Sequence, residues 1–247
     1  MTSPHVLILG CGRSGTSIFG ELFQAIELYD YHSEPDYTVI ENLDWSTPQA
    51  IKVPRASDSI EPEAGLSINM NDILSRSNHQ LHVFWIVRHP LDAIASLKIG
   101  ISKNWGHHPR PLDWKQWLNQ PLIEQCAHHW NYINEIGFKH IAGIAHIVKF
   151  EDMIENATSF ALNVTNRLGL PKETTDNLSV QSWCSRVQNT NNEHFIEAIT
   201  SRPYSTHDHQ ARIGRWKENL SDEEASVAWS MVQSTARTFG YSADLTN

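Results

Sequence analysis

Residues 6 to 23 read VLILGCGRSGTSIFGELF, and they combine an apolar run, a glycine-rich turn and an amphipathic segment. The apolar run at 6–9 predicts a buried strand, and the apolar spacing over 16–25 predicts a helix. Three glycines let the backbone curl so that successive N–H groups point inward: Gly10, Gly12 and Gly15. The positive end of the following helix dipole attracts an anion to the same place. The stretch therefore predicts a phosphate-binding loop between a strand and a helix.

The loop departs at one position from the ATP- and GTP-binding rule G-x-x-x-x-G-K-[ST]. Gly10 and Gly15 have the required spacing, and hydroxyls follow at Thr16 and Ser17. No lysine follows Gly15, and the cation is instead Arg13, inside the loop. The displaced cation argues against an ordinary nucleoside triphosphatase.

Composition bounds the class of protein. The chain has 247 residues, enough for one α/β domain with a large core. Its formal charge of −9 argues against a protein that coats nucleic acid, so any bound anion must meet a local cluster of cations. The chain has three widely spaced cysteines: Cys11, Cys126 and Cys184. This spacing predicts neither disulfides nor a zinc site, and it fits a protein of a reducing compartment best.

No segment reads as a signal peptide or approaches the ~18 apolar residues that span a membrane. We therefore expect no stable membrane insertion and a cytoplasmic protein.

Apolar runs without alternation recur along the chain, as expected for strands covered by helices on both faces. Further strands are predicted at 51–53, 81–87 and 146–150, and further helices over 90–99, 157–168 and 221–239. Their alternation predicts an α/β fold: a single P-loop-like domain over 1–247 with a mostly parallel sheet and helices on both faces. Ligands in such sheets bind beyond the carboxyl ends of the strands.

A second anion-binding signal follows the strand at 81–87. The chain reads RHPLDAIAS, so Arg88 projects from the same sheet edge as the phosphate loop, and Ser96 lies about two helical turns further on. A guanidinium and a hydroxyl together suit a second phosphate group. Alternatively, Arg88 caps the edge of the helix through Asp92.

These stretches resemble sulfotransferases that use 3′-phosphoadenosine-5′-phosphosulfate (PAPS). In that family an R/K-S-G-[TS]-[TS] loop holds the 5′-phosphosulfate and an R-[ND]-P-x-[DE]-x-x-x-S segment holds the 3′-phosphate. The matching residues here are Arg13-Ser14-Gly15-Thr16-Ser17, with Gly12 before them, and Arg88-His89-Pro90-Leu91-Asp92 with Ser96.

Two later stretches match the family in the same order. Phe150-Glu151-Asp152-Met153 and the following R-L-G-L resemble its Y-E-D-L exit and F-L-G-L. A basic loop that folds over the nucleotide in the family is matched by ARIGRWK at 211–217, which implies binding roles for Arg212, Gly214 and Arg215. Histidine for Asn or Asp at position 89 and phenylalanine for tyrosine at position 150 are departures that remove no required charge.

The resemblance also directs the search for a base. Carbohydrate-type members often have Y-E-P soon after the loop, and this chain has Tyr31-His32-Ser33-Glu34-Pro35. The cytosolic branch uses a histidine after K-T-H, whereas this chain reads IKVP at 51–54. Glu34 is therefore the expected base; alternatively it is a solvated loop acid, and Asp36 and Glu41 are weaker substitutes.

The implied reaction is a direct transfer without a metal. Loop amides, Arg13 and Thr16 would bind the 5′ end of PAPS, and Lys52 would polarise the leaving oxygen unless it is a surface charge. The 3′-phosphate would meet four residues: Arg88, Ser96, Arg212 and Arg215. The expected acceptor is a hydroxyl of a glycan, a lipid or a small molecule; a large anionic glycan is disfavoured because the chain has no basic run.

Two other classes fit less well. An ATP- and magnesium-dependent small-molecule kinase lacks its lysine after Gly15 and an aspartate at the end of the 81–87 strand. A non-catalytic nucleotide-binding module would not need both a candidate base and its cations.

Histidine and tryptophan pairs give weaker signals. A metal site at His107-His108 or His128-His129 is not favoured, because adjacent helical side chains diverge and no acid lies at ligand spacing. The segment 105–117 is expected to be irregular and either to line the acceptor pocket or to pack its tryptophans beneath a loop. Trp216 would stack beside the nucleotide loop or anchor the core.

Overall fold

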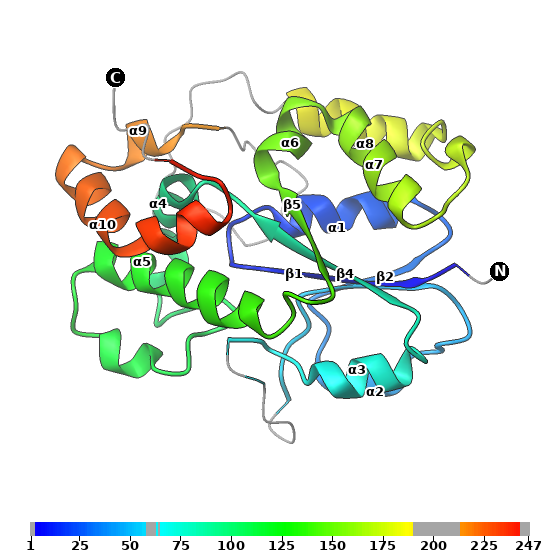
Figure 1. Ribbon diagram of the computed structural model, residues 1–247, viewed down its shortest axis with the longest axis horizontal. Coiled ribbons are helices and arrows are strands. Elements are labelled where there is room, and N and C mark those ends of the chain that lie inside the picture. The colour runs from blue at the N-terminus through cyan, green and yellow to red at the C-terminus, as the bar shows by residue number, and fades with distance from the viewer. Residues whose placement is uncertain (1–2, 58–62, 64, 190–212, 243–247) are drawn as a thin grey trace.

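Five parallel strands form one sheet in the order β2-β3-β1-β4-β5. This computed structural model describes residues 3–57, 63, 65–189 and 213–242 (Figure 1). The strands are β1 His5–Gly10, β2 Asp30–Ser33, β3 Gln49–Lys52, β4 Leu81–Val87 and β5 Ala145–Lys149. Because all of them run the same way, their carboxyl ends meet at one edge of the sheet, where ligands of such sheets bind.

Helices connect the strands and cover the sheet. They are α1 Thr16–Ala25, α2 Tyr37–Glu41, α3 Met70–Arg76, α4 Pro90–Ile101, α5 Leu122–Tyr132, α6 Phe150–Glu155, α7 Ala157–Arg167, α8 Leu178–Asn189, α9 Trp216–Asn219 and α10 Asp222–Thr238. Short turns of other helix types lie at Trp114–Trp117, Ile133–Gly137 and Lys172–Thr174. In the part of the chain that the structure describes, no helix has the length and apolarity needed to cross a bilayer.

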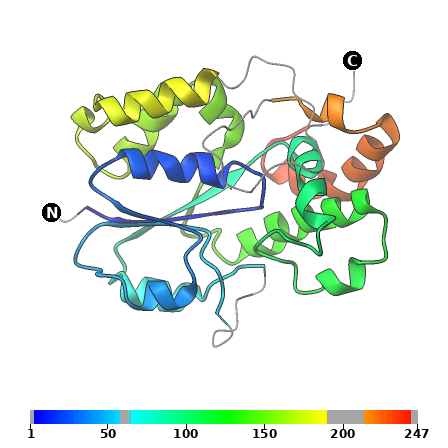
Figure 2. The same ribbon diagram turned by 180° about the vertical axis from the view of Figure 1, so that it is seen from behind.

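Alternate residues of the central strands feed two hydrophobic cores. One core joins the β1 side chains of Val6 and Ile8 to α1, α6, α7 and α8. The other joins Leu7 and Leu9 to α3, α4, α5 and α10 (Figures 1 and 2). The period of two that separates these side chains is the geometry of a strand buried on both faces. The predicted α/β fold, with a parallel sheet between helical layers, is confirmed.

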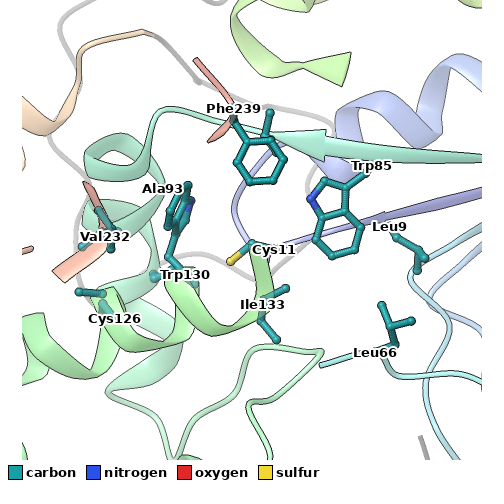
Figure 3. Close-up of a cluster of buried hydrophobic side chains, with 14 of the residues drawn as sticks. Leu9, Cys11, Leu66, Trp85, Ala93, Cys126, Trp130, Ile133, Val232 and Phe239 are labelled. Carbon is teal, nitrogen blue, oxygen red and sulfur yellow. The ribbon is translucent and has the colours of Figure 1, made fainter. Parts of the chain in front are cut away.

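The second core extends to the start of the phosphate loop. Cys11, the first residue after β1, is fully buried among Trp85, Trp130 and Ile133 (Figure 3). It behaves as a small apolar side chain, and burial raises the pKa of its thiol. The loop is thus anchored in the core on the side away from its ligand face.

The sequence missed some elements and shifted others. β2 was not predicted because its four residues, DYHS, are half-exposed or exposed and carry no apolar pattern. α5 was missed because histidines interrupt its apolar face. Phe150, expected to end a strand, instead begins α6, and its ring is buried.

Helix α5 also buries a histidine. His129 is 0% exposed, and its Nδ1 accepts a hydrogen bond of 2.9 Å from the Trp105 indole N–H. Burial lowers the pKa of His129 to about 3, with smaller contributions from the neighbouring His128 and His108. The imidazole is therefore neutral in the folded protein at neutral pH.

Because of this burial, we predict that the free energy of unfolding decreases as the pH is lowered. In the unfolded chain the imidazole takes up a proton near pH 6.5, while the folded chain resists protonation down to about pH 3. The stabilisation is present above pH 6.5 and is lost as the pH falls, by about 2 kcal/mol between pH 7 and 5. Urea unfolding across this range measures it. We expect His129→Phe to reduce the slope, because His107 and other histidines with lowered pKa values still contribute. His79→Asn, at an exposed site, should leave the slope unchanged. An unchanged slope in His129→Phe would contradict the assignment.

Candidate active site

The phosphate loop spans residues 10–17 between β1 and α1. Arg13 (φ 66°) and Gly15 (φ 93°) both adopt left-handed backbone conformations, and Gly15 directly precedes α1. The Ser14 N–H donates to the Cys11 carbonyl at 3.2 Å, which closes the turn. A Cβ at position 15 would lie 2.5 Å from the Phe150 ring, so only glycine fits. The predicted curled loop at a helix N-terminus is present.

The second motif contacts this loop directly. Arg13 Nε donates to Ser96 Oγ at 2.8 Å, and Arg88 Nη1 donates to the Arg13 carbonyl at 3.2 Å. Arg88 is 3% exposed, and its guanidinium lies 4.3 Å from the centre of the Phe150 ring. The structure therefore brings the two predicted anion-binding motifs together at one edge, with Phe150 beneath both.

The C-terminal motif joins them through Asp92. The Asp92 carboxylate accepts N–H bonds from Gly214 and Trp216, so its partners are backbone groups of this motif. Arg215, between them, is 3% exposed. Arg212 lies outside the described residues. The Trp216 side chain packs against the core that contains α4 and α10, which favours the core-anchor interpretation of this residue.

Glu151 fixes the turn that follows Arg88. Its Oε1 accepts from the His89 N–H at 2.8 Å, and its Oε2 accepts from the Tyr241 hydroxyl at 2.7 Å. The His89 ring packs near Trp229 and Tyr241. The departure from Asn or Asp at position 89 therefore builds a contact with the C-terminal part of the chain.

Glu34, Lys52 and Ser17 form a cluster beside the loop. Lys52 ends β3 and Glu34 follows β2, and these strands are neighbours in the sheet. Lys52 Nζ lies 2.5 Å from Glu34 Oε1 and 3.1 Å from Ser17 Oγ. The Lys52 side chain is 1% exposed, whereas that of Glu34 is 43% exposed. An acid open to solvent thus contacts a buried cation that also contacts the phosphate loop.

Burial lowers the pKa of Lys52, and the Glu34 carboxylate opposes this shift. A buried ammonium of lowered pKa is a stronger hydrogen-bond donor and proton donor than a surface lysine. The alternative of a solvated surface charge at position 52 does not fit this burial.

The two weaker base candidates approach other cations than Lys52. Asp36 is 69% exposed and approaches Arg55 at 4.0 Å, and Glu41 on α2 approaches Arg76 at 4.0 Å. Only Glu34, of the three candidate acids, contacts Lys52.

Two neighbours of the site were missed from the sequence. Arg55 Nη2 lies 3.9 Å from Glu34 Oε2, and its place three residues after Lys52 was the available signal. The buried His107 ring lies against Gly12 and Gly100. A Cβ on Gly12 would lie 3.4 Å from the His107 side chain. No local pattern predicts that second contact, because it joins a loop to a distant segment.

The His128-His129 pair has structural partners. His128 Nε2 lies 2.8 Å from Asp113, and its ring stacks on Trp117 at 3.9 Å between centroids. Within the described ranges no three His, Cys, Asp or Glu side chains gather as metal ligands. The segment 105–117 includes the short helical turn at Trp114–Trp117, and its Trp105 is fully buried.

A family model for the sulfotransferase domain matches residues 3–240. The chain belongs to the sulfotransferase family. This membership confirms the resemblance to PAPS-dependent sulfotransferases that the motifs carried, and it favours that enzyme class over a kinase. No curated protein sequence matches the chain.

Solved structures share the fold at low sequence identity. A mouse sulfotransferase complexed with PAP (adenosine 3′,5′-bisphosphate) has a TM-score of 0.62 and 12% identity, over 95% of this chain and 84% of that one. A retinol dehydratase in complex with androsterone and the inactive cofactor PAP has a TM-score of 0.54 and 12% identity, over 100% and 84%. The sulfotransferase domain from the curacin biosynthetic pathway has a TM-score of 0.51 and 14% identity, over 98% and 99%.

The contact of Gly15 with Phe150 yields a prediction. We expect Gly15→Ala to destabilise this sulfotransferase by at least about 2 kcal/mol, because a Cβ would overlap the Phe150 ring and favour a different backbone conformation. Adenosine 3′,5′-bisphosphate (PAP) should also bind at least about tenfold more weakly. Denaturant unfolding and calorimetry measure the two effects.

The matched control is Gly143→Ala. Nothing lies within 4 Å of a Cβ at Gly143, so its effect should stay within about 0.5 kcal/mol. Equal effects of the two substitutions would show that Gly15 has no special role.

Proposed function

We propose that this protein transfers a sulfuryl group from PAPS to a hydroxyl of a small-molecule or carbohydrate acceptor, with Glu34 as the base. The observation that carries the proposal is the cluster of Glu34, Lys52 and Ser17 beside the phosphate loop. It combines a solvent-accessible carboxylate, a buried cation and an anion-binding loop at the sheet edge.

Two groups of residues would bind the donor. The 5′-phosphosulfate would meet backbone N–H groups of the loop and the side chains of Arg13, Thr16 and Ser17, and this assignment also includes Gly12, Ser14 and Gly15. The 3′-phosphate would meet Arg88, Ser96 and the C-terminal motif of Arg212, Gly214 and Arg215. The Arg13–Ser96 and Arg88–Arg13 contacts support a single site with two anion-binding ends.

The reaction is an in-line displacement at sulfur. Glu34 takes the proton of the acceptor hydroxyl while the oxygen of that hydroxyl forms a bond to the sulfur. The bond from sulfur to the phosphate oxygen breaks, and the electron pair stays on that oxygen, giving a sulfate ester and PAP. Lys52 would donate to the leaving oxygen, and a donor placed there typically contributes about 3 kcal/mol.

The contact between Lys52 and Glu34 links the two ends of this displacement. Lys52 would stabilise the leaving oxygen and Glu34 would activate the attacking oxygen, and these two oxygens lie on opposite sides of the sulfur. Ser17 accepts a hydrogen bond from Lys52 and would keep the Lys52 ammonium directed at the loop.

A small acceptor is favoured by an accessible base and by the ligands of a protein with the same fold. Glu34 is 43% exposed, and the retinol dehydratase that shares the fold has been solved with retinol and with androsterone, both small molecules. A lipid alcohol or an oligosaccharide end fits the same chemistry. A panel of hydroxylated acceptors with labelled PAPS tests this, and transfer only to a polymeric anionic glycan would contradict it.

The donor assignment has a direct test. We expect PAP to bind without magnesium and far more tightly than adenosine 5′-monophosphate (AMP), because AMP lacks the phosphate assigned to Arg88 and Ser96. Calorimetry with EDTA present measures both dissociation constants. Equal affinities would mean that no second phosphate is bound.

Glu34→Gln tests the base. We expect turnover to fall by a factor of about 10² or more, because the amide cannot take a proton, while PAP affinity stays close to wild type. Asp36→Asn is the matched control, since Asp36 is more exposed and lacks the contact with Lys52; it should keep most activity. Full activity in Glu34→Gln would require another base.

A further inference from the structure

The Asp92 carboxylate holds a distant stretch of backbone. Its Oδ2 accepts from the Gly214 N–H at 2.8 Å and its Oδ1 from the Trp216 N–H at 2.9 Å, across 122 and 124 positions of the chain. Asp92 itself is 1% exposed. Hydrogen bonds from N–H groups to a buried carboxylate are strong, so this contact fixes the backbone at 214–216 relative to α4.

Helix α4 carries a second contact on the same face. Ser96 follows Asp92 by one helical turn, so the two side chains lie on one side of α4. Ser96 Oγ accepts from Arg13 of the phosphate loop, and Arg88, just before α4, also reaches that loop. The start of α4 therefore joins the phosphate loop to the C-terminal motif.

Arg215 is the residue whose backbone this contact holds on both sides. It lies between the two N–H groups that Asp92 binds, and it is 3% exposed. Gly214 has a left-handed φ of 76°, and a Cβ there would meet nothing within 4 Å, so the glycine serves the backbone conformation rather than space. Fixing the backbone on both sides of a residue limits where its side chain can reach.

An acid this close to an anion site needs an explanation. A carboxylate repels a phosphate, and it would weaken donor binding if it faced the ligand. Here both oxygens face backbone N–H groups. The negative charge also lies in the first turn of α4, where the helix dipole favours it.

We propose that Asp92 is a positioning residue that builds the 3′-phosphate end of the donor site without touching the nucleotide. By fixing the backbone around Arg215, it sets the selectivity for a 3′,5′-bisphosphate over a 5′-monophosphate. The proposal rests on the donor site proposed above. It differs from a purely structural role, in which Asp92 would only dock α9 and α10 on α4.

Asp92→Asn tests the proposal, because asparagine keeps the size and presents an NH₂ group to one of the two N–H donors. We expect PAP affinity to fall roughly tenfold or more and AMP affinity to change by less than about threefold. Calorimetry without magnesium measures both constants, and thermal unfolding monitors the fold.

The matched control is Lys98→Gln. Lys98 also lies on α4 and binds the C-terminal part of the chain, through Glu224 of α10 at 2.7 Å. It should alter thermal stability without changing the ratio of PAP to AMP affinity. A changed ratio in this control would overturn the proposal, because any weakening of α4 packing would then suffice.

Two substitutions at Gly214 test the same contact from its other side. Both alanine and asparagine add a Cβ, but asparagine adopts the left-handed conformation more readily. We therefore expect Gly214→Ala to lose more PAP affinity than Gly214→Asn. These variants decide the question if Asp92→Asn does not fold, and wild-type selectivity in both would overturn the proposal.

The outcomes separate this inference from the proposed function. If the wild-type protein does not distinguish PAP from AMP, the donor-site proposal fails and the role of Asp92 falls with it. If the wild-type protein does distinguish them and Asp92→Asn retains the same selectivity, only the role of Asp92 is overturned. Equal weakening of PAP and AMP in Asp92→Asn would likewise reduce Asp92 to a structural residue.

Discussion

The buried guanidinium of Arg88 determines the geometry of the whole site. Removing a cation from water is costly unless it is hydrogen-bonded, so a buried arginine must be held by its neighbours. Arg88 binds the Arg13 carbonyl and lies on the Phe150 ring, which also presses against Gly15. One side chain therefore sets the separation between the phosphate loop and the turn after β4, and with it the spacing between two anion-binding ends. A donor with two separated anionic groups is the ligand that such a fixed spacing would select.

Local patterns predicted the parts of the site but not how they meet. The glycines of the loop, the apolar run of β4 and the capping box at Ser221 act over a few residues, so the sequence alone locates them. Lys52 and Glu34 meet because β2 and β3 are neighbours, and strand order does not follow from local pattern. β2 itself carries polar edge residues, so the strand that places Glu34 was the one the sequence missed. The contact of Asp92 with Gly214 depends on how the last helices return to α4, across 122 positions of the chain.

Backbone strain is present at the same sheet edge. Glu34 and Val53 have φ values of 50° and 36°, and positive φ is a genuine outlier for a β-branched residue such as valine. Two hydrogen bonds hold this geometry: the Glu34 N–H donates to the Lys52 carbonyl at 2.9 Å, and the Val53 N–H donates to the Ile8 carbonyl at 2.8 Å. Strain of this kind persists only where the surrounding structure over-determines it, and it is common at functional sites. Here the sheet directs both strand ends so that the acid and the lysine face each other.

Charge is distributed unevenly between this edge and the rest of the chain. Acidic residues outnumber basic ones by 28 to 19, yet Lys52, Arg88 and Arg215 are each at most 3% exposed. A cation in a poorly solvated position attracts an anion more strongly than one in water, whereas exposed acids are screened within about 8 Å at physiological salt. A small anion that enters the site thus meets the buried cations at short range and in a weak dielectric. A long polyanion also meets the net negative charge of the chain, which no run of basic residues in the sequence offsets. The same uneven distribution agrees with the proposed compact, highly charged donor and with a proposed acceptor that is not an extended polyanion.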